Sequence, residues 1–562
     1  MKRRRKKKKT SYNRIILILI ALAAAAGLAV FLVEQNSPST KRADLGLYFS
    51  VDEEDEAAIV KDGLLSEDKG IRRDGELYFP LSEAARAVNK RLYYDEAEDL
   101  VCFSTPTEYL TSSTEELAAE GSLVRIDGVP CLSLSFLEEW TDMACEVFEE
   151  PLRIVIRETW PYEEADVLSE TAVRLEPSIR SDILTDAEEG QTLTVLTAEE
   201  ETEGWTCVTT SDGLTGYIET EKLGEVRQMG EDHESPLGAY TSLSMDQKVN
   251  MVFYATNNAD TNSFLADKLS GVTGVNVIAP TWYFLDGGTK LTVLSDPDIV
   301  SDLHEKGYKV FALINDFDGA IGSYDETYET LERTSNRQSL VRQIVDNALE
   351  TGIDGLNLDV ELVSEDCGPA YLELVRELSA ECRNHGLYFS VDTYVPMNWS
   401  AYLDREELGI LADYVVIMCY DEHYEGSEEA GSIASMTFTE NGLDRALRMI
   451  PKEKLIAAIP FYTRLWVSEE GSLPTSTVMS MAEAAAYVSE NGLTVYPDED
   501  SGQNLAEKRE GGVTYQIWLE DTGSIEKRMT LIRERDLAGV AEWDLGSQED
   551  AVWEVITQGL AQ

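Results

Sequence analysis

Three polar residues alternate with apolar ones in the run GLNLDVEL, where they are Asn357, Asp359 and Glu361. Successive side chains of a β-strand point to opposite faces, so a strand here places all three on one face and the intervening apolar residues on the other. The apolar face is suited to pack under helices, so the polar face has to point inward. Burying carboxyl groups there costs free energy, which indicates that they have a function. Two carboxyls at this spacing repel each other when both are ionised, which keeps one protonated. The pattern predicts a general acid.

Further strands and helices are needed to hold this strand in place, and the C-terminal half of the chain has a repeating pattern that predicts them. Apolar runs alternate there with amphipathic segments, which indicates parallel strands joined by helices. The number of runs and the length of the segment predict an α/β fold, a (β/α)8 TIM barrel over residues 245–562. The predicted strands are 249–255, 274–285, 309–316, 353–362, 387–395, 414–422, 455–462 and 537–546.

The segment DGLNLDVE, residues 354–361, is similar to the DGxDxDxE signature of glycoside hydrolase family 18, the chitinases and related endoglycosidases. The resemblance covers residues 245–562 and implies that Glu361 protonates the glycosidic oxygen. It also implies that Asp359 orients the substrate's acetamido group, whose oxygen is the nucleophile, in a substrate-assisted, retaining reaction. Asp354 lies off the inward-facing parity and is expected to be a structural hydrogen-bond acceptor. No metal or cofactor is expected.

Asn357 stands where this family most commonly has Asp. The variant DGxNxDxE is similar to the bacterial spore and cell-wall branch, whose members often carry surface-binding modules in front of the barrel. An amide can hydrogen-bond Asp359 but cannot take up a proton, so we expect slower hydrolysis or a shifted pH dependence.

Other strand ends resemble those that bind sugar in this family. The run MCYD ends the sixth predicted strand, and the resemblance implies that Tyr420 binds the acetamido group and Asp421 the sugar hydroxyls. Trp543 ends the eighth strand, where the family places an aromatic floor under the sugar. Further candidates at strand ends could line the cleft or equally serve packing: Tyr283, Asn315, Tyr394 and Tyr462.

An internal repeat precedes the barrel. Residues 74–103 are echoed by residues 127–156, each with a turn, a strand, a helix and a second strand. The repeat resembles the copper amine oxidase N-terminal-like stalk domain, and we expect an α+β domain over residues 56–160. No ligand cluster is evident in it, so a structural spacer is favoured over a catalytic domain.

Short strands separated by turn residues follow at 167–227, and a polar linker at 228–244 leads to the barrel. This segment resembles a bacterial SH3 domain, a small all-β module, in Trp205 after its turn and in the run Gly216-Tyr217-Ile218. The resemblance implies peptidoglycan as a partner, whereas Trp205 could equally be a core aromatic residue.

The first 33 residues carry nine of the 47 Lys and Arg and no acidic residue. The basic tail, residues 1–14, precedes an uncharged apolar run, residues 15–33, that is long enough to cross a bilayer. We therefore expect a single-pass anchor in the cytoplasmic membrane, with everything from a spacer at 34–55 onward outside the cell. A cleaved signal peptide, giving a secreted protein, is the alternative.

The rest of the chain holds all 105 Asp and Glu, which argues against nucleic acid as a partner. Its seven cysteines and four histidines form neither a disulfide framework nor a metal-binding pattern.

Three classes of function remain open. The first is an enzyme that hydrolyses N-acetylglucosamine-containing glycan, either cell-wall or spore peptidoglycan or chitin. The second is a lectin-like binding protein on the same barrel, and the third a structural surface protein. Lectins of the family typically lose the terminal acid, so Glu361 favours the enzyme.

Overall fold

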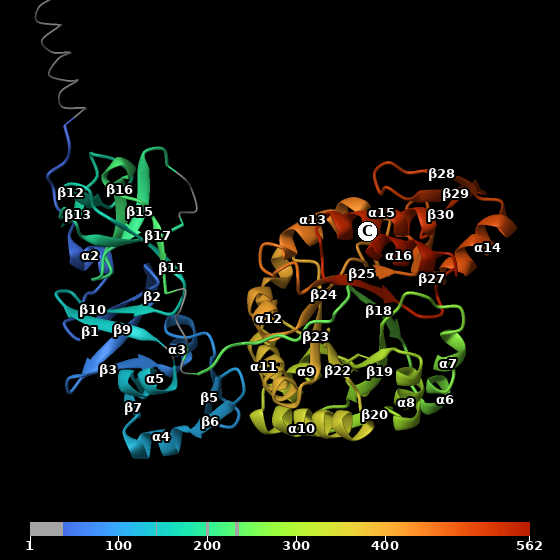
Figure 1. Ribbon diagram of the computed structural model, residues 1–562, viewed down its shortest axis with the longest axis horizontal. Helices are drawn as coiled ribbons and strands as arrows, with labels where there is room; N and C mark the ends of the chain where they lie inside the picture. Colours follow the sequence, from blue (N-terminus) through green and yellow to red (C-terminus); the bar gives the residue numbers. More distant parts are fainter. Residues whose placement is uncertain are drawn as a thin grey trace, which may run out of the picture. The chain divides into compact units, whose positions relative to one another are not determined.

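The computed structural model describes residues 37–561, except 142, 198–201, 231–234, 236 and 318. It divides into two compact units, coloured along the chain in Figure 1. The first unit comprises the described parts of residues 1–92 and 115–236, and the second comprises residues 93–114 together with those from 237 onward.

The second unit contains a closed barrel of eight parallel strands, which confirms the predicted fold. In the barrel each strand pairs with its two neighbours, and β18 closes the ring by pairing with both β19 and β31. Around the ring the strands are β18 (Val249–Tyr254), β19 (Val277–Leu285), β21 (Lys309–Asn315), β22 (Gly355–Asp359), β23 (Tyr388–Tyr394), β24 (Tyr414–Met418), β25 (Leu455–Pro460) and β31 (Gly539–Trp543).

The strands are apolar on both faces because each is buried on both sides. Met251 and Phe253 of β18 belong to the cluster that fills the barrel, whereas Val252 belongs to the layer between strands and helices. Helices surround the strands in Figure 1. The main ones are α8 (Pro297–Glu305), α9 (Tyr324–Leu331), α10 (Thr334–Thr351), α11 (Gly368–His385), α12 (Arg405–Leu411), α13 (Met436–Ala446), α15 (Thr522–Glu534) and α16 (Val552–Ala561).

A separate antiparallel sheet interrupts the barrel between its seventh and eighth strands. It has the order β27-β26-β30-β29-β28 and packs on α14 (Met481–Asn491) around a small core. Its strands are β26 (Tyr462–Glu469), β27 (Thr475–Ser480), β28 (Thr494–Pro497), β29 (Asn504–Glu510) and β30 (Val513–Leu519). This sheet was not predicted from the sequence.

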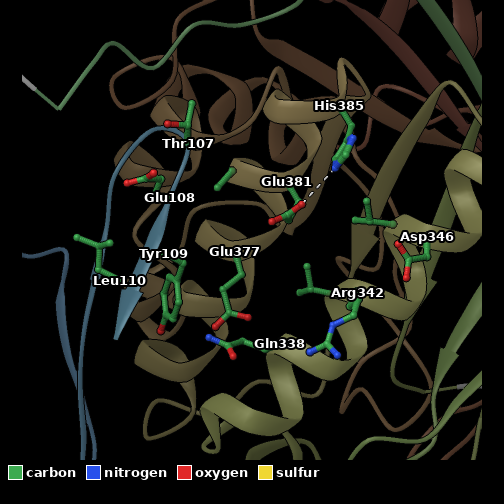
Figure 2. Close-up of a pocket in the computed structure, with 13 residues that line it drawn as sticks. Thr107, Glu108, Tyr109, Leu110, Gln338, Arg342, Asp346, Glu377, Glu381 and His385 are labelled. Carbon is green, nitrogen blue, oxygen red and sulfur yellow. Dashed lines mark ion pairs between the residues drawn. The ribbon is translucent and has the colours of Figure 1, made fainter. Parts of the chain in front are cut away.

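The second unit also takes in part of the predicted stalk. The sheet β4 (Leu92–Asp95), β5 (Leu100–Ser104) and β6 (Tyr109–Ser113) lies against α10 and α11. Asp95 accepts a hydrogen bond from the Thr334 backbone N–H at 2.6 Å, and Tyr109 accepts one from Arg337 at 3.0 Å. Figure 2 shows the pocket of about 550 Å³ at this contact, with Tyr109 of β6 beside Glu377 of α11.

The first unit contains a seven-stranded sheet of order β7-β8-β3-β2-β1-β10-β9. Both copies of the predicted repeat start in it: β3 and α3 (Leu81–Ala87) correspond to β8 and α5 (Leu134–Trp140). The second copy ends in the sheet through β9 and β10, whereas the first copy leaves it. The strands are β1 (Glu56–Lys61), β2 (Leu64–Arg73), β3 (Glu76–Pro80), β7 (Leu123–Ile126), β8 (Val129–Ser133), β9 (Ala144–Glu149) and β10 (Leu152–Arg157).

A second seven-stranded sheet in this unit is the SH3-like region. Its strands are β11 (Tyr162–Asp166), β12 (Thr171–Arg174), β13 (Ile183–Ala187), β14 (Thr192–Val195), β15 (Trp205–Thr209), β16 (Thr215–Glu219) and β17 (Arg227–Met229). Gly216 is required where β16 meets β12, because a Cβ atom there would lie 2.3 Å from the Arg174 carbonyl oxygen. Trp205 begins β15 and is half-buried.

The predicted localisation needs correction. Within the described part of the chain, no helix has the length and apolar character needed to span a bilayer. The segment proposed as an anchor, residues 15–33, lies outside the described residues. A single-pass membrane protein is therefore not supported by the structure.

Candidate active site

Asn357 and Asp359 lie on β22, and Glu361 follows two residues after the strand ends. Asn357 is fully buried, Asp359 is 4% exposed and Glu361 is half-buried at the rim. The three therefore form a gradient from the barrel interior to solvent. Such a gradient suits a carboxyl at the rim that has to reach substrate and a second one held rigidly behind it.

The position of Glu361 is fixed by Asp316, which directly follows β21. Asp316 Oδ1 accepts a hydrogen bond of 2.9 Å from the Glu361 backbone N–H, and its Oδ2 accepts one of 3.1 Å from Leu362. The Thr327 hydroxyl donates to the same Oδ2 at 2.7 Å. Burial raises the pKa of Asp316, while these hydrogen bonds lower it. Asn315 was predicted from the sequence as a site residue, whereas the neighbouring Asp316 was not.

A second unpredicted carboxyl, Asp392, lies inside the barrel on β23. Its Oδ1 accepts a hydrogen bond of 2.8 Å from Asn357 Nδ2, which also donates to Ser390 Oγ at 2.9 Å. Burial raises the pKa of Asp392 well above its ordinary value. The hydrogen bond from Asn357 lowers it, and the charge on Glu361 raises it further.

Two tyrosines predicted for the site lie within electrostatic reach of these carboxyls. Burial raises the pKa of Tyr420, and the charges on Asp359, Asp392 and Glu361 add to the rise. Burial and the charge on Glu361 likewise raise the pKa of Tyr394. Both phenols therefore keep their protons at neutral pH and can act as hydrogen-bond donors toward a bound substrate.

A cavity of about 630 Å³ is lined by residues at the ends of β18, β21, β24 and β31 and by residues of β26 and β27. Asp421, Tyr462 and Trp543 line it, and the Tyr462 hydroxyl donates to Asp421 Oδ1 at 2.6 Å. The Trp543 ring packs on Phe253 with 5.6 Å between ring centroids, which fixes the plane of the indole. Other lining residues include Thr256, Asn257, Phe317, Arg464, Glu483 and Asp544. A cavity with an aromatic wall and several polar groups suits a sugar, which has apolar faces and hydroxyl edges.

The remaining predicted residues lie at differing depths. Asn315 is fully buried, and its strand register places it beside Asp359. The Tyr283 hydroxyl donates to Asn347 on α10 at 2.8 Å, so this side chain lies in the layer between strands and helices and away from the cavity. Asp354 accepts from Lys309 at 3.0 Å and from the Val310 backbone N–H at 2.9 Å, as expected of a structural acceptor.

No group of three or more His, Cys, Asp or Glu is arranged to hold a metal ion among the residues described. The carboxyls near Glu361 are engaged with amides, hydroxyls and backbone N–H groups, as the contacts above show.

Comparison with known proteins agrees with this geometry. Residues 249–548 match the model of glycosyl hydrolases family 18, and residues 169–223 match that of the bacterial SH3 domain. The uncharacterized glycosylase YvbX of Bacillus subtilis is 24% identical over 266 residues, which are 45% of this chain and 76% of YvbX. The cortical fragment-lytic enzyme of Bacillus anthracis is 23% identical over 245 residues, 42% of this chain and 56% of that enzyme.

Solved structures show the same fold. A chitinase from Chromobacterium violaceum superposes with a TM-score of 0.50 at 22% identity, over 56% of this chain and 99% of the chitinase chain. The spore cortex-lytic enzyme SleL of Bacillus cereus also gives a TM-score of 0.50, at 18% identity, over 59% of this chain and 77% of its own. Because the family match spans more than half of the sequence and coincides with the barrel, the chain belongs to glycosyl hydrolases family 18 and is a glycosidase.

Proposed function

We propose that this glycosidase cleaves N-acetylglucosamine-containing glycan, with cell-wall or spore peptidoglycan favoured over chitin, by a substrate-assisted, retaining mechanism. The observation that carries the proposal is the placement of Glu361. Its backbone is pinned by Asp316 at the rim of the barrel, directly beyond the inward-facing Asp359. A half-buried carboxyl held just beyond the carboxyl end of a barrel strand is positioned for general acid catalysis.

In the proposed reaction Glu361 gives its proton to the glycosidic oxygen as the bond to the anomeric carbon breaks. The acetamido oxygen of the same sugar attacks that carbon, and Asp359 and Tyr420 orient and polarise the acetamido group. Water then opens the cyclic intermediate with Glu361 as base, so two displacements keep the anomeric configuration. Asp421 and Tyr462 bind sugar hydroxyls above Trp543, which supports the apolar sugar face.

Related proteins support the choice of substrate class. Cortical fragment-lytic enzymes and chitinases are among the similar proteins, and both names point to polymers that contain N-acetylglucosamine. The SH3 module is proposed to bind peptidoglycan and to raise the local concentration of the barrel at the wall. The part of the predicted stalk that lies in the first unit, residues 56–92 and 115–160, is proposed to be a spacer.

The test is digestion of purified peptidoglycan and of chitin oligomers by the purified protein, followed by mass analysis of the fragments. Glu361→Gln removes the proton donor and should lower kcat by at least about 100-fold, because general acid catalysis is typically worth 10²–10⁴-fold. A deacetylated sugar at the cleavage position should resist cleavage, since it lacks the internal nucleophile.

Two results would contradict the proposal. Full cleavage of the deacetylated substrate, or a product of inverted configuration, would exclude the substrate-assisted mechanism. A wild-type protein that binds the glycan tightly without cleaving it would instead identify the lectin-like alternative.

A further inference from the structure

Asp392 brings a third carboxyl into the barrel interior, on the strand next to the pair on β22. Its side chain is 5% exposed, and Ser390, two residues earlier, lies on the same inward face of β23. Both residues accept hydrogen bonds from the amide nitrogen of Asn357, at 2.8 and 2.9 Å. The Asn357 amide therefore directs both of its N–H groups toward β23.

This arrangement fixes where the Asn357 oxygen points. The oxygen of a planar amide lies on the side opposite its N–H donors, so Oδ1 points away from Asp392 and Ser390. It is buried, with no hydrogen-bond partner among the described residues. A buried amide oxygen in this state costs free energy, so its orientation has to be imposed by the bonds on the nitrogen side. Asp359 lies two residues further along the same face of β22.

We propose that Asp392 is a positioning residue of the glycosidase site: it supplies from β23 the second carboxyl that Asn357 cannot supply from β22, and it fixes the Asn357 amide on the face of β22 that carries Asp359. The inference rests on the function proposed above. The family commonly has a carboxyl at the position of Asn357, and in this chain a carboxyl lies on the neighbouring strand instead. The Asn357–Asp392 pair keeps one amide and one carboxyl in hydrogen-bond contact inside the barrel.

The charge state of Asp392 follows from its surroundings. Burial raises its pKa well above the ordinary value, the hydrogen bond from Asn357 lowers it and the charge on Glu361 raises it further, so the surroundings favour the protonated carboxyl. Tyr420 and Tyr371 also lie within electrostatic reach of it. A neutral Asp392 spares the interior a third negative charge, whereas an ionised one opposes ionisation of Glu361.

The decisive variant is Asp392→Asn, which keeps an oxygen able to accept the bond from Asn357 but removes the ionisable group. A purely structural hydrogen bond would survive, with kcat unchanged. We expect kcat on chitin oligomers to fall about 10- to 100-fold, the range caused by small misplacements in active sites, with little change in KM. The alkaline limb of the pH–rate profile should stay in place, because a neutral amide then replaces a protonated carboxyl and the charge near Glu361 does not change.

Two further variants test whether the loss of kcat comes from the missing carboxyl or from a disturbed fold. The exchange Asn357→Asp/Asp392→Asn returns the carboxyl to β22 and keeps one amide and one carboxyl in the pair, so it should recover most of the lost kcat. Ser390→Ala removes the other acceptor of the same amide and leaves the carboxyl, so it should leave the pH profile unchanged. Thermal unfolding of each variant shows whether it is folded.

A measurement independent of turnover distinguishes this inference from the proposed function. The infrared spectrum of the full protein at neutral pH should contain the C=O band of a protonated carboxyl that disappears in Asp392→Asn. If wild type cleaves neither peptidoglycan nor chitin oligomers while this band is present, the proposed function fails and the neutral buried Asp392 stands. Absence of the band, or wild-type kcat in Asp392→Asn, would overturn the inference.

Discussion

At the residue scale, the candidate site is built from side chains on three adjacent strands. Asn357 and Asp359 come from β22, Asp316 follows β21, and Asp392 comes from β23. The period-two pattern of β22 was sufficient to predict the direction of its own polar residues, because alternation is a local property of a strand. Asp316 and Asp392 were missed because their roles depend on which strands become neighbours and in what register. The one local signal was a carboxylate within each otherwise apolar run.

Asp316→Asn tests whether the geometry of Glu361 matters for catalysis. The substitution replaces one acceptor oxygen with an N–H donor, which then faces either the Glu361 backbone N–H or both the Leu362 backbone N–H and the Thr327 hydroxyl. The segment carrying Glu361 should shift, and kcat should fall about 10- to 100-fold while KM changes little. Thr327→Val is the matched control, since it leaves both backbone contacts intact; an equal loss in that variant would refute the explanation.

At the scale of elements, the eight barrel strands were all predicted, because each is a continuous apolar run bounded by polar segments. The sheet in which β4 and β5 lie was not predicted. These strands have the same local pattern as β9 and β10, which pair within the first seven-stranded sheet, yet they form a separate sheet with β6 and contact α10. The partner residues Asp95 and Thr334 are 239 positions apart. Local pattern carries no information about such a contact.

The contact of β6 with α10 and α11 covers a buried ion pair. Arg337 Nε donates to Glu377 at 3.0 Å, and both side chains are at most 3% exposed. Arg337→Met should destabilise the second unit by roughly 3–5 kcal/mol, because it leaves a buried carboxyl without its counter-charge. Chemical denaturation of the full chain measures the effect. Arg342→Met is the control on the same helix: Arg342 is exposed at the pocket of Figure 2, so its loss should change stability little.

The pH dependence of that destabilisation provides a second check. Burial raises the pKa of Glu377 to about 8 even beside Arg337. An acid with a raised pKa in the folded state binds its proton more tightly there than in the unfolded chain, so its contribution favours folding at low pH and is lost as pH rises toward 8. The penalty of Arg337→Met should therefore be smaller at pH 5 than at pH 8. A penalty independent of pH would show that removing Arg337 does not change the pKa of Glu377.

At the scale of the whole molecule, the chain combines a glycosidase barrel with an SH3 module in a different compact unit. The proposed role of the SH3 module is to retain the enzyme on an insoluble polymer. Such a role affects the effective concentration of substrate and not the chemistry.

Trp205→Ala tests this division of labour. Trp205 begins β15 and is only half-buried, so its indole offers an aromatic surface to a wall peptide or sugar. The variant should bind insoluble peptidoglycan more weakly in a pull-down assay while it cleaves soluble oligomers at the wild-type rate. Trp140→Ala is the matched control, a half-buried tryptophan on α5 in the same unit but outside the SH3-like sheet. If both variants lose wall binding equally, general destabilisation of the unit explains the loss; if Trp205→Ala alone lowers cleavage of soluble oligomers, the module takes part in the catalytic site.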